Sequence, residues 1–120
     1  ERPADDVGRA ALAERVAQRG RVEVGARLLV DVRDGTEVAA TGLIEGAVNI
    51  SRGMIEFRAD QDHPYHDPEF QTDRPMILYC ASGGRSALAG KTLQDMGYGR
   101  VHNLGAFKEA VEAGLPTTAA

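Results

Sequence analysis

Apolar residues along the chain gather in short runs that alternate with longer segments of helical periodicity. Four runs have the length and composition of strands that are buried on both faces of a parallel sheet. They cover residues 28–32, 47–50, 76–79 and 101–104. Three segments carry apolar residues on one helical face and end near a glycine, at residues 6–19, 85–96 and 106–113. Strands that alternate with helices predict an α/β domain with a parallel sheet and helices on both of its faces.

Two segments interrupt this alternation. Residues 34–41 begin with turn-forming residues and continue as a short helical turn. Residues 60–75 are dominated by Asp, His, Pro and Gln, and we predict a long surface loop there. A length of 120 residues fits one domain. We therefore expect a single domain over residues 1–120, with its core at about 7–116 and a tail at 117–120.

The charge balance and the cysteine count narrow the functional classes. A net charge of −4 argues against a nucleic-acid partner, which usually requires a basic surface. No apolar run approaches the ~18 residues of a membrane-spanning helix, so we expect no membrane partner. A single cysteine cannot form an internal disulfide, and a free thiol fits a reducing, cytoplasmic location.

The single cysteine, Cys80, follows the predicted strand at 76–79 and precedes a turn of small residues and a helix. In an open α/β sheet, ligands bind beyond the carboxyl ends of the strands, where this residue is placed. Backbone N–H groups of the turn and the helix start favour negative charge on the sulfur. We therefore predict Cys80 as the catalytic nucleophile, with a lowered pKa to which Arg85 contributes. The predicted substrate-binding residues are Ala81, Ser82, Gly83, Gly84, Arg85 and Ser86.

Three charged residues are candidates for a supporting role. Asp31 and Arg33 follow a strand that should neighbour the active loop, where they would organise its floor. The alternative, which we favour, is a structural ion pair, for example between Arg33 and Glu37 four residues on. Arg52 either guards the pocket entrance against an anionic donor or is an ordinary surface arginine.

His63 and His66 lie among acidic residues in the predicted loop, which raises the question of a metal site. Two histidines three residues apart in a segment broken by proline are a poor ligand set, and no cysteine joins them. We therefore predict no metal and no cofactor, and a structural role for His102. The alternative to a reactive Cys80 is a buried, inert thiol, because free cysteines are usually buried.

The chain resembles the rhodanese homology domain over about residues 7–116. The matching segments, in order, are 28–33, 42–50, 79–86, 104–107 and 113–116. This resemblance implies a five-stranded parallel sheet flanked by helices. It also implies that Cys80 accepts sulfane sulfur from a donor such as thiosulfate and passes it to a thiol or to cyanide.

Three features depart from the pattern of that family. The family's His and Pro are absent from residues 42–47, and no Trp follows Gly105. Members of the family that prefer thiosulfate carry a basic residue directly after the cysteine. Here Ala81 follows Cys80 instead. We therefore expect thiosulfate to serve as a test substrate rather than as the physiological donor.

Two other functions use a cysteine loop of this kind. Protein tyrosine phosphatases carry an arginine six positions after the cysteine, whereas Arg85 is the fifth residue after Cys80 and Ser86 is the sixth. By resemblance, the shorter loop suits sulfur and the longer one suits phosphate or arsenate, which disfavours a phosphatase or an arsenate reductase. The second interpretation is a persulfide carrier that serves a partner, such as a protein thiol acceptor, without turnover.

Overall fold

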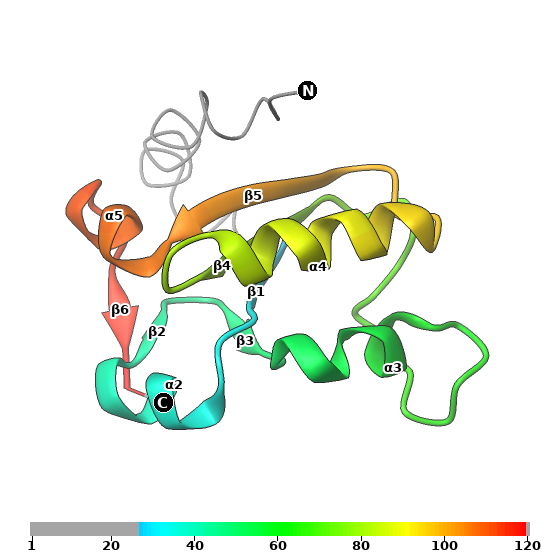
Figure 1. Ribbon diagram of the computed structural model, residues 1–120, viewed down its shortest axis with the longest axis horizontal. Helices are drawn as coiled ribbons and strands as arrows, with labels where there is room; N and C mark the ends of the chain where they lie inside the picture. The colour runs from blue at the N-terminus through cyan, green and yellow to red at the C-terminus, as the bar shows by residue number, and fades with distance from the viewer. Residues whose placement is uncertain (1–26, 120) are drawn as a thin grey trace.

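The fold is built on a parallel sheet whose strands lie in the order β3–β1–β4–β5 (Figure 1). The computed structural model describes residues 27–119, so the helix predicted at 6–19 lies outside the described residues. The strands are β1 (Leu28–Asp31), β3 (Val48–Asn49), β4 (Met76–Cys80) and β5 (Val101–Ala106). Every residue of β1 and β4 is buried, as central parallel strands covered on both faces require.

Helices cover both faces of this sheet, which confirms the predicted α/β class. The helical elements are α2 (Gly35–Thr41), the 3-10 helix η1 (Arg52–Met54), α3 (Ile55–Ala59), α4 (Gly84–Asp95) and α5 (Phe107–Glu112). Side chains alternate along β4, so that Leu78 and Cys80 pack in one apolar cluster with α3 and α4. Ile77 and Tyr79 pack in a second cluster with α5. None of the described helices is long and apolar enough to cross a membrane.

The strand count and the C-terminal end differ from the expectation. Within residues 27–119 the parallel sheet has four strands rather than five. A separate antiparallel pair joins β2 (Leu43–Ile44) to β6 (Thr117–Thr118), so the start of the expected tail belongs to the fold. Gly42 permits this pairing, because its φ is +82° and a Cβ there would lie 2.4 Å from the carbonyl oxygen of Thr118. Two threonines carry no periodicity, and the sequence pattern therefore did not indicate β6.

The segment at 60–75 is an irregular loop, but it contributes one side chain to the core. Phe70 is completely buried and meets Tyr98 edge-on, with 6.2 Å between the ring centroids. His63 lies against the Phe57 ring, and His66 is hydrogen-bonded through Nε2 to the Phe70 carbonyl oxygen. Among the described residues, no three potential metal ligands gather in one place.

A buried ion pair lies at the end of β1. Arg33 donates from Nη2 to the Asp31 carboxylate at 2.8 Å, and both side chains are almost fully buried. Nη2 also donates to the carbonyl oxygen of Gly42 at 2.9 Å, and the guanidinium carbon lies 4.3 Å from the Phe107 ring centre. Arg33 therefore forms a structural ion pair, as we expected, but Glu37 was the wrong partner. Arg33 reaches into the fold toward Asp31, whereas Glu37 pairs with a different arginine.

Replacing Arg33 by methionine should lower the free energy of unfolding by about 3–5 kcal/mol, because the Asp31 carboxylate would stay buried without its partner. Urea denaturation followed by circular dichroism measures this loss. Lys91→Met is the control, since Lys91 and Asp95 form an exposed pair worth at most ~1 kcal/mol. Equal losses in the two variants would contradict the role given to the buried pair.

Candidate active site

Cys80 is the last residue of β4, and its side chain is completely buried. The chain turns sharply after it, because Gly83 adopts a left-handed conformation with a φ of +99°, and α4 begins at Gly84. This turn directs the Gly83 backbone N–H toward the sulfur, with 3.0 Å between the nitrogen and Sγ. The predicted sequence of strand, cysteine, tight turn and helix is therefore present.

The Ser86 hydroxyl also faces the Cys80 sulfur, and together with the backbone N–H of Gly83 it forms what we call the cysteine cradle. Its oxygen lies 3.5 Å from the Cys80 sulfur, 3.1 Å from the Gly83 carbonyl oxygen and 2.7 Å from Asn103 Oδ1. One hydroxyl proton cannot serve three acceptors, and the shortest distance favours Asn103 in the thiol state. Rotation of the hydroxyl toward the sulfur becomes favourable when the thiol ionises, since hydrogen bonds to a charged acceptor are stronger.

Asn103 is a site residue that the sequence analysis did not identify. It lies on β5, donates from Nδ2 to the Gly83 carbonyl oxygen at 3.2 Å, and accepts from the Gly105 N–H at 3.0 Å. These bonds link the loop to the neighbouring strand. The available signal was an amide side chain inside a predicted parallel strand, because such strands are usually apolar throughout.

The environment of the Cys80 sulfur favours the thiolate. Burial alone raises the pKa of Cys80, but hydrogen bonds from the Ser86 hydroxyl and from the backbone N–H groups of Ser86, Gly83 and Ser82 outweigh it, so the pKa is lowered. The backbone groups are fixed by the turn and need no reorientation when charge develops. The loop therefore provides a site for an anionic sulfur atom.

Arg85 forms an ion pair with Glu37 of α2. Its two terminal nitrogens donate to the two carboxylate oxygens at 2.7 and 3.0 Å, in a bidentate pair. This pair, helped by the backbone N–H of Asp34, lowers the pKa of Glu37 to about 2. The two residues are far apart in the sequence, so no local pattern indicated the contact.

Arg52 links η1 to the helices α3 and α4. It donates to Glu56 Oε1 of α3 and to Thr92 Oγ1 of α4, each at 3.0 Å. Its guanidinium is therefore engaged in contacts between η1, α3 and α4. It does not line the cavity described next.

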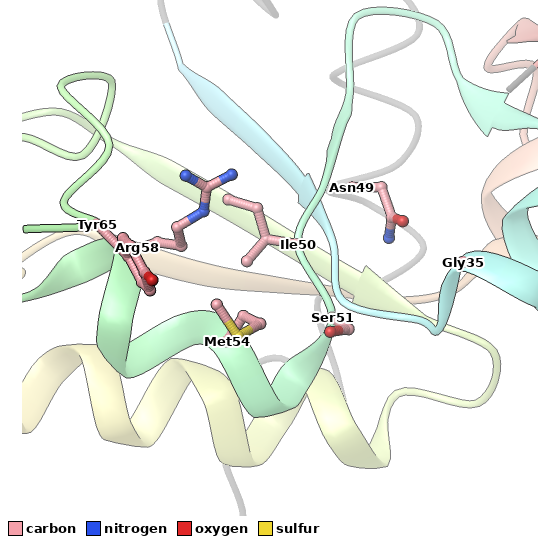
Figure 2. Close-up of a pocket in the computed structure, with 7 residues that line it drawn as sticks. All are labelled: Gly35, Asn49, Ile50, Ser51, Met54, Arg58 and Tyr65. Carbon is pink, nitrogen blue, oxygen red and sulfur yellow. The ribbon is translucent and has the colours of Figure 1, made fainter.

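A cavity of about 250 Å³ lies between the end of β3 and α3. In Figure 2, Met54 and Arg58 project from the η1–α3 segment toward Ile50, with Gly35 and Tyr65 at the margins. Residues 80–86 contribute nothing to its lining, so the cavity is separate from the cysteine cradle. It was not foreseen from the sequence.

The fold and this loop define a class of α/β domain in which a cysteine at the end of a central strand precedes a glycine turn and a helix. The rhodanese-like domain matches residues 10–113, and the chain belongs to this family. The resemblance seen in the sequence is thereby confirmed.

Several relatives support this assignment. A protein named sulfurtransferase from Allochromatium vinosum is 38% identical over 93 residues, which cover 77% of this chain and 78% of that protein. A structure from Rhodopseudomonas palustris, of unknown function and described as a possible tyrosine phosphatase, is 40% identical with a TM-score of 0.79, covering 91% of this chain and 81% of that one. A human single-domain sulfurtransferase is 30% identical with a TM-score of 0.65, covering 79% and 89%.

We predict that Ser86→Ala raises the pKa of Cys80, because the variant loses a donor to the thiolate but keeps the backbone donors. The rate of alkylation by iodoacetamide, followed against pH, reports the midpoint, which in the wild type should lie below about 8.5. Ser51→Ala, outside the loop, should leave the midpoint unchanged. An unchanged midpoint in Ser86→Ala would show that the hydroxyl proton stays on Asn103.

Proposed function

We propose that this protein transfers sulfane sulfur from a donor such as thiosulfate to a thiol or cyanide acceptor through a persulfide on Cys80. The observation that carries the proposal is the convergence of fixed N–H donors on a buried cysteine sulfur. Family membership and the relatives named as sulfurtransferases support it. A free, reactive thiol also favours a reducing compartment such as the cytoplasm.

In the first half of the reaction the Cys80 thiolate attacks the outer sulfur of the donor. With thiosulfate, a bond forms between Sγ and that sulfur, the sulfur–sulfur bond of the donor breaks, and sulfite leaves with the electron pair. The product is a persulfide whose terminal sulfur carries the negative charge. The loop residues 81–86 would hold this anion with their N–H groups, as an oxyanion hole holds an oxygen.

In the second half the acceptor attacks the terminal sulfur of the persulfide. Cyanide leaves as thiocyanate, or an acceptor thiolate leaves as a new persulfide, and in both cases the Cys80 thiolate is regenerated. Neither half needs an electron from outside or a cofactor. A protein thiol is an acceptor of the same chemistry, and a carrier without turnover would stop before this step.

A phosphatase is the second candidate, because the relative from Rhodopseudomonas palustris is described as a possible tyrosine phosphatase. Phosphate transfer in a cysteine loop needs a cation to balance a dianion. Here Arg85 is already engaged by both oxygens of Glu37. The charge balance therefore disfavours phosphate transfer, which needs a dianion in the loop, whereas sulfur transfer can also start from a donor of lower charge.

Cys80→Ser should abolish thiocyanate formation from thiosulfate and cyanide, because the oxygen nucleophile cannot form a persulfide. Steady-state rates at several fixed donor concentrations should give the parallel-line pattern of double displacement in the wild type. Asp95→Asn, an exposed change on α4, is the control and should retain wild-type rates. Residual turnover in Cys80→Ser would exclude Cys80 as the sulfur carrier.

An aryl phosphate such as p-nitrophenyl phosphate should give essentially no turnover with the same preparation. The reason is the bidentate pairing of Arg85 with Glu37, which leaves loop residues 81–86 without a free cation for a phosphate dianion. Release of p-nitrophenol measures the activity. Turnover that disappears in Cys80→Ser would instead assign this protein to the phosphatases.

A further inference from the structure

Three arginines around the carboxyl end of the sheet are each neutralised by a carboxylate. The pairs are Arg33 with Asp31 at 2.8 Å, Arg52 with Glu56 at 3.0 Å and Arg85 with Glu37 at 2.7 Å. Arg33 lies a few residues after β1, Arg52 after β3 and Arg85 after β4. Of the three, Arg85 belongs to the segment that directly follows Cys80, and within residues 27–119 its charge is balanced by Glu37.

Two other cations do not supply an unbalanced charge there. Arg58 has no ion pair among the described residues, but it lines the separate cavity beside α3. Lys108 is on α5, which covers the sheet face opposite to the one where Cys80 packs. The donors that meet the Cys80 sulfur are therefore N–H and O–H dipoles, as far as the described residues extend.

Arg85 is the second residue of α4 and the fifth residue after Cys80, which places its charge close to the active loop. Its hydrogen bond to Glu37 is the main cause that raises its pKa, and the charge of Cys80 is a smaller cause in the same direction. About a third of each side chain of this pair is exposed, so the carboxylate and the guanidinium both lie at the surface near the loop. A donor that approaches Cys80 therefore meets a neutral pair.

Charge separates the donors that such a site accepts. Thiosulfate is a dianion, and its approach to a thiolate brings three negative charges together. An organic persulfide brings at most one charge, and its reaction conserves atoms and charge in the same way. The Cys80 thiolate bonds to the outer sulfur, the sulfur–sulfur bond of the persulfide breaks, and an organic thiolate leaves with the electron pair.

On the basis of the sulfur transfer proposed above, we infer that Glu37 is a specificity-determining residue. By neutralising Arg85, it selects against dianionic donors such as thiosulfate and in favour of organic persulfides. The carboxylate acts through Arg85 and touches neither sulfur atom, so its role is to set the charge at the entrance to the loop. The protein's net charge of −4 acts in the same direction.

Glu37→Gln tests this inference, because glutamine keeps the shape and a hydrogen-bond acceptor for Arg85 but removes the negative charge. The measured quantity is kcat/KM for the donor, which in double displacement reports the first half-reaction alone. We expect kcat/KM for thiosulfate to rise roughly tenfold, since an uncompensated guanidinium attracts a dianion about twice as strongly as a monoanion. With the persulfide of 2-mercaptoethanol, the change should stay within about threefold.

Glu69→Gln is the matched control. It also removes a carboxylate from an arginine pair, here with Arg74, close to the amino end of β4 and thus at the other end of the strand from Cys80. The ratio of the two donor rates should be the same in this control as in the wild type. Circular dichroism and thermal unfolding show whether each variant is folded.

The salt dependence gives a second readout that uses the wild type itself. Between about 0.02 and about 0.5 M NaCl, kcat/KM for thiosulfate should rise in the wild type, because salt screens the repulsion between anions. In Glu37→Gln the same change of salt should lower it, because salt now screens an attraction. A steep fall in the wild type would reveal an uncompensated cation and overturn the inference.

The remaining outcomes separate this inference from the proposed function. If the wild type accepts sulfur from at least one donor but Glu37→Gln leaves the ratio of donor rates unchanged, the inference is wrong and the proposed function stands. If the wild type accepts sulfur from neither donor, the proposed function is wrong and the inference falls with it.

Discussion

The left-handed backbone at Gly83 is the constraint on which the rest of the site depends. With a φ of +99°, this residue turns its N–H toward the Cys80 sulfur while its carbonyl oxygen faces the first turn of α4. That oxygen accepts from the N–H of Ala87 at 3.0 Å and from Asn103 Nδ2 at 3.2 Å, so Gly83 is anchored to both α4 and β5. The cradle is therefore built before any donor arrives, which is the condition under which dipoles stabilise developing charge most effectively.

Paired charges and fixed dipoles determine the electrostatics of the site. The buried pair of Arg33 and Asp31 fixes the segment after β1 and contributes no net charge, and Glu37 likewise balances Arg85. Within residues 27–119, fixed dipoles are left to stabilise the sulfur anion. Dipoles at short range favour one atom in one position and attract a distant ion only weakly, because their field falls faster with distance than that of a charge. Such a site suits a small transferred sulfur atom better than a large dianion.

The parts of this account that the sequence could predict are local in the chain. Buried apolar runs located β1 and β4, and the cysteine with its glycines marked the loop, since these patterns lie within a few residues of one another. The ion pair of Arg85 with Glu37 and the hydrogen bond from Asn103 to Gly83 could not be predicted. Glu37 and Asn103 reach the loop only through the three-dimensional arrangement of α2 and β5. The roles of the loop residues in catalysis remain predictions from the sequence that the geometry supports.

The most direct test of the central claim is the intact mass of the protein after incubation with a sulfur donor, followed by peptide mapping. The account predicts one added sulfur, about 32 mass units, on the peptide that contains Cys80, and its complete removal by cyanide. An unmodified protein after treatment with both thiosulfate and an organic persulfide would contradict the account.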